Sequence, residues 1–214
     1  MNTELILIRH GETAWNRERR MQGQTDTPLS SVGRSQAEAV GARLARHPFA
    51  ALYSSDLARA WDTAAAISRA SGRDIRREPA LRERTFGMFE GLTYDEMALR
   101  YPDEHARFSA RDPDYAVPGG ESPRQFFERS LGCLERIAAA HTGACVVVVT
   151  HGLVLDTLHR AAHGMPLDAK REAPLLNASL NTFARATDGW REIGWGDVAH
   201  LAEVGVTRFE GRAV

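Results

Sequence analysis

Short apolar runs alternate with amphipathic stretches along this chain of 214 residues. Branched apolar residues without alternation predict buried strands at 5–8 and 146–149, because a strand covered on both faces is apolar throughout. A shorter apolar run predicts a further strand at 51–53. Apolar positions at helical spacing predict helices at 29–47, 56–70, 122–140 and 152–162.

Capping signals mark where two helices begin. Ser122 is followed by Pro123 and then by Gln125, which is a capping box with proline at the first helical position. Thr93 is followed three residues later by Glu96, which predicts the start of a short helix.

The order of the elements predicts the fold class. Strands that alternate with helices indicate one α/β domain over residues 1–214, with a mainly parallel central sheet and helices on both faces. The runs 181–186 and 190–195 flank a Thr-Asp-Gly turn and predict a hairpin. The stretch 85–120 has fewer apolar anchors and more Pro, Asp and Tyr, and we expect it to form a small cap over a site.

Composition and charge narrow the class of protein. Hydrophobic residues make up 43 % of the chain and charged residues 26 %, which is typical of a globular protein. With 27 basic and 28 acidic side chains the net charge is −1, so we expect neither nucleic acid nor a membrane as a partner. No secretory signal pattern is evident, and the cysteines, Cys133 and Cys145, fit core packing in a cytoplasmic protein.

Residue types that bind phosphate follow three of the predicted strands. Arg9 and His10 end the first run, His151 follows the run at 146–149, and Arg59 lies in the first turn of the helix after 51–53. In open α/β sheets, ligands bind beyond the carboxyl ends of the strands, where helix N-termini favour anions. The guanidinium fork also matches phosphate. If the three strands are neighbours, these residues alone indicate a phosphate pocket that contains two imidazoles.

Each of these residues also has a structural explanation. A lone histidine after a strand is usually part of a hydrogen-bonded framework, and an arginine is by default a surface residue. Ser55 and Asp56 are interpreted as helix caps, and His200 as structural. A metal site has less support, because neither a Cys-rich set nor a His-Glu-x-x-His helix is present.

The segment LIRHGETAWN, residues 7–16, is similar to the opening block of the histidine phosphatase superfamily, also called the phosphoglycerate mutase-like family. Arg-His-Gly alone is a weak motif. Further blocks follow in the order that the family has, and together they cover most of the chain: QGQTDTPLSSVGRSQA, YSSDLARAWDTA, LRERTFGMFEGLTYDE, PGGES and VVVVTHGLVL. The ordered set makes the resemblance specific.

The resemblance implies a role for each matched residue. It makes His10 the nucleophile and Glu83 the proton donor, with a phosphate pocket built from Arg9, Arg59 and His151. A neutral imidazole can attack phosphorus and form a phosphohistidine, which divides one displacement into two. The cationic side chains would stabilise the transferring oxygens, and a carboxylic acid would protonate the leaving alkoxide. These cations take the role of a metal ion, so we expect no metal and no other cofactor.

Other residues have less specific assignments. Asn16 and Gln22 match positions that surround the pocket in relatives, and we expect them to bind substrate; Gln24 is a further candidate. Glu90 is expected to stabilise a turn. Glu121 is expected to stabilise a loop or to line the mouth of the site.

The resemblance does not decide the net reaction, because the family contains phosphatases, which transfer the phosphoryl group to water, and mutases, which return it to another hydroxyl. The short interval 83–121 and the short end TRFEGRAV favour a phosphatase that acts on small phosphomonoesters through a phosphohistidine. A cofactor-dependent phosphoglycerate mutase is the alternative. A non-catalytic phospho-ligand scaffold is less favoured, because such proteins usually lose the nucleophile or the acid. Phosphosugar and α-ribazole-phosphate relatives share these motifs, so the natural substrate stays open, as does a homodimer.

Overall fold

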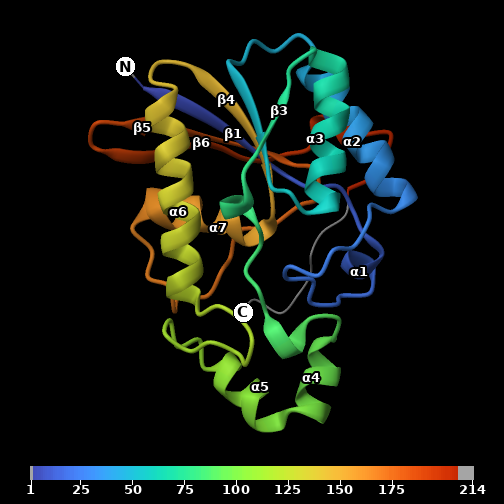
Figure 1. Ribbon diagram of the computed structural model, residues 1–214, viewed down its shortest axis with the longest axis vertical. Helices are drawn as coiled ribbons and strands as arrows, with labels where there is room; N and C mark the ends of the chain where they lie inside the picture. Colours follow the sequence, from blue (N-terminus) through green and yellow to red (C-terminus); the bar gives the residue numbers. More distant parts are fainter. Residues whose placement is uncertain (1, 207–214) are drawn as a thin grey trace.

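A six-stranded sheet runs through the computed structural model, which describes residues 2–206 (Figure 1). The strands are β1 (Thr3–Arg9), β2 (Ala51–Ser54), β3 (Ile75–Arg77), β4 (Cys145–Thr150), β5 (Leu180–Ala186) and β6 (Gly189–Asp197). Their order in the sheet is β3-β2-β4-β1-β5-β6, and β3, β2, β4 and β1 run parallel. Strand β5 runs antiparallel to β1 and pairs with β6. The predicted mainly parallel sheet and the hairpin are therefore confirmed.

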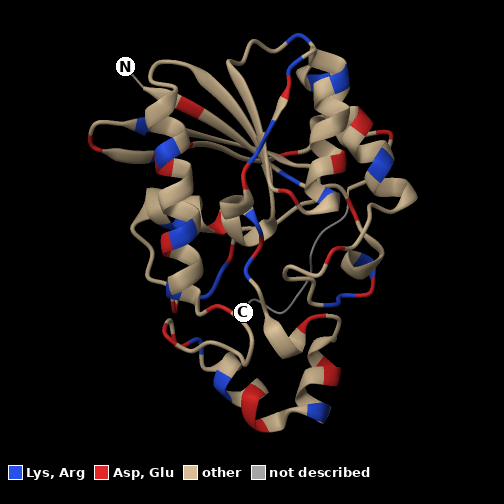
Figure 2. Cartoon of the chain, in the orientation of Figure 1, with Lys and Arg blue, Asp and Glu red and all other residues tan. Residues whose placement is uncertain are grey.

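Helices cover both faces of the sheet. The helices are α1 (Ala14–Arg17), α2 (Ser31–Leu44), α3 (Ala58–Ser71), α4 (Tyr94–Arg100), α5 (Pro102–Ser109), α6 (Pro123–Ala140) and α7 (Gly152–His163). Helices α2 and α3 pack on one face, and α6 and α7 pack on the other (Figure 1). No helix in the described part of the chain is long and apolar enough to cross a bilayer. Basic and acidic residues are interspersed along α6, along the α2–α3 layer and on α4 and α5 (Figure 2).

The valines of β4 explain why this strand is apolar throughout. Val146 and Val148 pack into the layer formed with α6 and α7, whereas Val147 and Val149 pack into the layer formed with α2 and α3. All four side chains are fully buried. Because β1 and β4 are covered on both faces, the ends of these strands are held in a rigid frame.

The capping boxes lie where the sequence places them. The hydroxyl of Ser122 accepts the N–H of Gln125 at 3.2 Å, and the side-chain carbonyl of Gln125 accepts the N–H of Ser122 at 3.0 Å. Thr93 and Glu96 form the same reciprocal pair at the start of α4. Both helices therefore begin at the predicted residue.

The expectation that Ser55 and Asp56 cap the helix after β2 is wrong. Leu57 occupies the N-cap of α3 and its side chain makes no capping hydrogen bond, while the carboxylate of Asp26 accepts the N–H of Ala58 at 2.7 Å. Asp56 accepts two hydrogen bonds from Arg82, each at 2.7 Å, because the carboxylate matches the guanidinium fork. Asp56 therefore connects the segment after β2 to the segment that carries Arg82, and does not cap α3.

Residues 85–120 contain α4 and α5 and lie beyond the carboxyl ends of the strands (Figure 1). They have an apolar cluster of their own, which includes Phe86, Phe89, Met97, Phe108 and Val117. Gly87 has a φ of 51°, and a Cβ there would lie 2.1 Å from the carbonyl oxygen of Pro118. Only glycine allows this close approach, which brings the two ends of the segment together. The C-terminal sequence TRFEGRAV, residues 207–214, lies outside the described residues.

Candidate active site

The order of the sheet brings three strand ends together. Strand β1 lies beside β4, and β4 lies beside β2. The N–H of His10 donates to the carbonyl oxygen of Thr150 at 2.9 Å, and the ring centroids of His10 and His151 are 5.3 Å apart. A pocket with a volume of about 140 Å³ opens at this edge. Its lining includes the predicted residues Arg9, His10, Asn16, Gln22, Arg59 and Glu83. His151 does not line the pocket; it is fully buried beside His10.

His10 has one nitrogen prepared for attack. Its Nδ1 lies 2.7 Å from the carbonyl oxygen of Gly11. A carbonyl oxygen only accepts, so Nδ1 carries the hydrogen and Nε2 keeps its lone pair. Burial lowers the pKa of His10 well below its usual value, and the positive charges of Arg59 and Arg9 lower it further. The imidazole is therefore neutral at physiological pH, which is the form that can act as a nucleophile.

Arg59 and Arg9 supply fixed positive charge beside this ring. Arg59 is fully buried, and its guanidinium donates to the carbonyl oxygens of Gly23 at 2.7 Å and Thr25 at 3.0 Å. Arg9 donates to the carbonyl oxygen of Leu175 at 2.6 Å. Burial is the main cause that lowers the pKa of each guanidinium to about 10, so both stay charged at neutral pH. Two charged guanidinium groups at one pocket favour an anion there.

A serine that the sequence assigned to capping holds His151. The Oγ of Ser55 lies 2.8 Å from Nε2 of His151, and both residues are buried. Burial lowers the pKa of His151 well below its usual value, with contributions from Arg59 and His10. Nδ1 of His151 has no hydrogen-bond partner among the described residues. The one sequence signal for Ser55 is its position directly after β2, next to the helix that carries Arg59.

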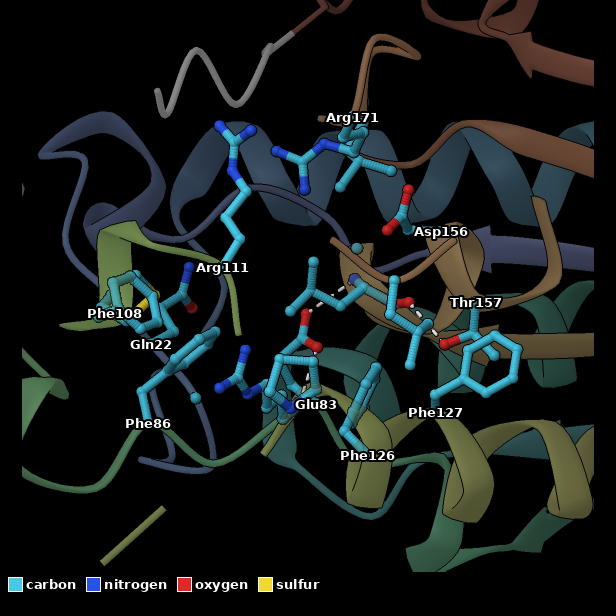
Figure 3. A pocket seen from close by; sticks show the side chains of 18 of the residues that line it. Gln22, Glu83, Phe86, Phe108, Arg111, Phe126, Phe127, Asp156, Thr157 and Arg171 are labelled. Atoms are coloured by element: carbon cyan, nitrogen blue, oxygen red, sulfur yellow. Dashed lines mark hydrogen bonds between the residues drawn. The ribbon is translucent and has the colours of Figure 1, made fainter. Parts of the chain in front are cut away.

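Glu83 points into the same pocket, near Phe86 and Phe126 (Figure 3). Its carboxylate accepts the backbone N–H of Arg84 at 2.9 Å and that of Leu153 at 3.1 Å. Burial raises the pKa of Glu83, while these N–H groups and the nearby arginines oppose the increase. The net increase favours the protonated acid, and two hydrogen bonds fix the direction of the carboxyl group.

Asn16 and Gln22 present amide groups to the pocket. The Oδ1 atom of Asn16 accepts the N–H of Thr13 at 3.0 Å and the amide of Asn177 at 3.2 Å. The Oε1 atom of Gln22 accepts the hydroxyl of Thr13 at 3.0 Å. Both side-chain oxygens are therefore engaged within the protein, which directs the NH₂ groups to the pocket. Gln24 does not line the pocket, and its amide donates to the backbone carbonyl of Glu83 at 3.1 Å.

The neighbouring glutamates stabilise loops. Glu90 accepts the N–H groups of Phe86 at 3.0 Å and Gln24 at 3.1 Å. Glu121 forms an ion pair with Arg129 at 2.7 Å. Neither glutamate lines the pocket, so the expectation of a loop-stabilising role holds for both. The ring of His200 lies 3.0 Å from the carbonyl oxygen of Ala178, outside the pocket.

The outer part of the pocket contains residues that the sequence did not single out. Its aromatic side chains come from the segment 85–120 and from α6: Phe86, Tyr94, Phe108, Tyr115, Phe126 and Phe127. Arg111 and Arg171 add positive charge there (Figure 3). Phe86 and Tyr94 belong to the block LRERTFGMFEGLTYDE, but nothing in the sequence assigns them to the pocket, and the other residues come from segments without a motif.

Two groups of side chains in the described part of the chain are close enough to share a metal ion. They are Glu4, His47 and Cys145, and His159, His163 and Glu192. Neither group lines the pocket.

Comparisons with known proteins agree with this geometry. The profile of the histidine phosphatase superfamily (branch 1) matches residues 5–198. The chain is 40 % identical to phosphoglycerate mutase-like protein 4 of Arabidopsis thaliana over 207 residues, which cover 94 % of this chain and 88 % of that protein. It is 41 % identical to the metal-independent phosphoserine phosphatase of Arabidopsis thaliana over 216 residues, with coverage of 99 % and 89 %.

Solved structures give the same result. Bacillus stearothermophilus YhfR superposes with a TM-score of 0.85 at 36 % identity, over 93 % of this chain and 99 % of that chain. The mycobacterial glucosyl-3-phosphoglycerate phosphatase superposes with a TM-score of 0.79 at 31 % identity, over 92 % and 99 %.

Proposed function

This chain belongs to branch 1 of the histidine phosphatase superfamily, and we propose that it hydrolyses small phosphomonoesters through a phosphohistidine formed on His10. It is a phosphoric monoester hydrolase, in line with relatives named as phosphatases of phosphoserine and of glucosyl-3-phosphoglycerate. The observation that carries the mechanism is a neutral imidazole that shares one pocket with two buried arginines and with a carboxyl group whose pKa is raised.

In the first step, Arg9 and Arg59 bind the phosphoryl oxygens, and the amides of Asn16 and Gln22 donate further hydrogen bonds. Nε2 of His10 attacks phosphorus while the bond from phosphorus to the leaving oxygen breaks. The proton of the Glu83 carboxyl group moves to that oxygen, and the alcohol leaves. The buried cations stabilise the charge on the equatorial oxygens, and His151 supports them from behind His10.

In the second step, the Glu83 carboxylate takes a proton from a water molecule that attacks the phosphohistidine. The bond from nitrogen to phosphorus breaks, and inorganic phosphate leaves. His10 returns to the neutral form and Glu83 to the acid form, so the cycle needs no metal ion or other cofactor. Activity that is unchanged in EDTA and inhibited by vanadate, a mimic of five-coordinate phosphorus, would support this; loss in EDTA that Mg²⁺ restores would contradict it.

Hydrolysis is favoured over mutase activity by the segment after Glu83. A mutase has to keep water from its phosphohistidine until the second hydroxyl is in place. Here the interval between Glu83 and Glu121 is occupied by the short helices α4 and α5, and we propose that residues 85–120 act as a small cap that leaves water access. Phosphoglycerate mutase activity is the second candidate, because one relative is named phosphoglycerate mutase-like.

One reaction separates the two activities. The enzyme is given 3-phosphoglycerate with 2,3-bisphosphoglycerate as primer, and both glycerate isomers and free phosphate are followed. We expect phosphate release to be faster than formation of 2-phosphoglycerate. Isomerisation that is faster by an order of magnitude would replace the phosphatase with the mutase. Failure to hydrolyse p-nitrophenyl phosphate between mildly acidic and neutral pH would instead favour a binding scaffold.

We further propose that residues 1–214 form one domain that acts in the cytoplasm. Cys133 and Cys145 are both free thiols, as expected in a reducing compartment. We also propose a homodimer, with the edge strand β6 as the contact, since Ile193 on this strand is 62 % exposed. Sedimentation velocity of wild type and Ile193→Lys tests this, and a monomeric wild type would contradict it.

A further inference from the structure

Arg171 is a buried cation without a counter-ion among residues 2–206. It lies in the segment between α7 and β5, lines the pocket and is only 9 % exposed. Its guanidinium has no hydrogen bond or ion pair with any residue that the structure describes. Arginine is rarely buried unless it is paired, because removing the charge from water is costly. A buried and unpaired guanidinium beside an active site is positioned to bind an anionic group of the ligand.

The surroundings of Arg171 increase this cost. Its charge contributes to the lowered pKa of Arg9, of which burial is the main cause. Arg111 lines the same pocket, and Figure 3 shows both guanidinium groups at one end of it. Asp156 lies nearby, but its carboxylate accepts from Nε of Arg160 at 2.8 Å and so already has a partner. The cations thus lie together here, and no acid in the described part of the chain pairs with Arg171.

The segment that carries Arg171 is held in place. The guanidinium of Arg160 donates to the carbonyl oxygen of Pro166 at 2.5 Å and to that of Ala169 at 3.0 Å. The same side chain is oriented by Asp156, one helical turn earlier on α7. Arg160 thus connects the helix that follows His151 to the loop before Arg171, which fixes the distance between the phosphate site and this second cation.

Tyr94 adds a donor in the same region. Its hydroxyl is buried and has no hydrogen-bond partner among the described residues, although the side chain lines the pocket. Burial raises the pKa of Tyr94 to about 12, against the opposing charges of Arg171, Arg84 and Arg111. The hydroxyl therefore keeps its proton at neutral pH, and its cost of burial is offset only when a ligand accepts a hydrogen bond from it.

We propose that Arg171 and Tyr94 form a subsite for a carboxylate on the substrate, so that the enzyme prefers phosphomonoesters that also carry a carboxylate. This inference rests on the proposed function, because the reacting phosphoryl group has to occupy the site at His10. Arg9 and Arg59 already match the phosphoryl dianion, and the single unpaired charge of Arg171 matches a monoanion. The hydroxyl of Tyr94 supplies a further hydrogen bond to the same carboxylate.

The test uses two esters that differ at one group. 3-Phosphoglycerate has a carboxylate where glycerol 3-phosphate has a hydroxymethyl group, and the ratio of their kcat/KM values measures carboxylate preference. Both values come from one enzyme sample, so any inactive fraction cancels. We expect the ratio to fall about 10- to 100-fold in Arg171→Met, which is the range for a hydrogen bond to a charged group. Arg171→Lys should keep part of the preference and Tyr94→Phe should lower it, whereas Arg100→Met, an exposed arginine on α4, should keep all of it.

The outcomes separate this inference from the proposed function. A wild-type ratio near 1, or a ratio in Arg171→Met within threefold of the wild-type ratio, would overturn the carboxylate subsite. If the same enzyme hydrolyses p-nitrophenyl phosphate, the proposed phosphatase function still holds. No hydrolysis of any ester would overturn the proposed function. Propane-1,3-diyl bisphosphate tests whether the subsite binds a second phosphate instead. The ratio of its kcat/KM to that of propyl phosphate is compared with the ratio for 3-phosphoglycerate and glycerol 3-phosphate. If the bisphosphate ratio is the larger and is lost in Arg171→Met, the subsite is for a second phosphate and the carboxylate assignment is wrong.

Discussion

The Nδ1–H of His10 donates a hydrogen bond to the carbonyl oxygen of Gly11 at 2.7 Å. This contact with the next residue fixes the tautomer of the ring and leaves the Nε2 lone pair free to attack phosphorus. Burial and the two flanking arginines keep the ring from taking a second proton. The nucleophile is therefore prepared by its own backbone and by the same cations that bind the phosphoryl group.

Replacement of His10 tests this assignment. His10→Ala should reduce kcat by roughly 10³-fold or more, because the covalent route is lost. Circular dichroism should show that the variant remains folded. His105→Ala on α5 is the control, since His105 does not line the pocket, and it should be active. A folded His10→Ala protein with activity within tenfold of wild type would refute the assignment.

Glu83→Gln should separate substrates by their leaving group. The amide cannot supply the proton, so kcat/KM for glycerol 3-phosphate should fall about 10²- to 10⁴-fold. The value for p-nitrophenyl phosphate should fall far less, because nitrophenolate leaves without protonation. Glu78→Gln, which removes a carboxylate outside the pocket, should affect both esters equally. Equal losses on both esters in Glu83→Gln would mean that Glu83 is not the proton donor.

The pH profile follows from the directions of the two pKa shifts. Turnover of an alkyl ester needs neutral His10, which is present above its lowered pKa, and protonated Glu83, which is present below its raised pKa. We therefore expect kcat/KM to fall on the alkaline side as Glu83 ionises and on the acid side as His10 is protonated. In Glu83→Gln the alkaline limb should disappear from the residual turnover of the alkyl ester. Persistence of that limb would assign it to another group.

Much of the site could be predicted from the sequence because its residues follow apolar strands directly. Arg9, His10 and His151 are next to β1 and β4 in the chain, and parallel strands bring their carboxyl ends to one edge. Glu83 came from the family resemblance, because spacing alone does not select it from its neighbours. Local pattern was therefore sufficient where the strand itself determines the position of the side chain.

The remaining residues depend on contacts between distant segments. Ser55 has the local features of a cap, yet its hydroxyl pairs with His151, 96 residues later. Tyr94 and Arg171 reach the pocket only because α4 and the loop after α7 fold over the strand ends. No periodicity or spacing in the sequence records these contacts, so the outer pocket could not be predicted.

Replacement by alanine should change the stability of the protein in opposite directions at two glycines, Gly33 in α2 and Gly132 in α6. A Cβ at Gly33 would lie 2.0 Å from the carbonyl oxygen of Glu12, next to the loop that carries His10. Gly33→Ala should therefore lower the free energy of unfolding by about 1–3 kcal/mol and reduce activity. Gly132→Ala, in the middle of α6, meets nothing closer than 3.8 Å and should raise that free energy by about 0.5–1 kcal/mol. Urea unfolding curves measure both, and a stable, fully active Gly33→Ala would show that this contact is not tight.

The phosphoenzyme itself is the most direct test of the account. In Glu83→Gln, p-nitrophenyl phosphate should still phosphorylate His10, whereas hydrolysis of the intermediate slows because water loses its base. Rapid mixing should then give a burst of nitrophenol close to one equivalent per site. After an alkaline quench, mass spectrometry should find the phosphoryl group on the peptide that contains His10, and the label should be lost in acid, since protonation of the nitrogen makes it a good leaving group. A burst that survives His10→Ala, or label on any other residue, would contradict a phosphohistidine at His10.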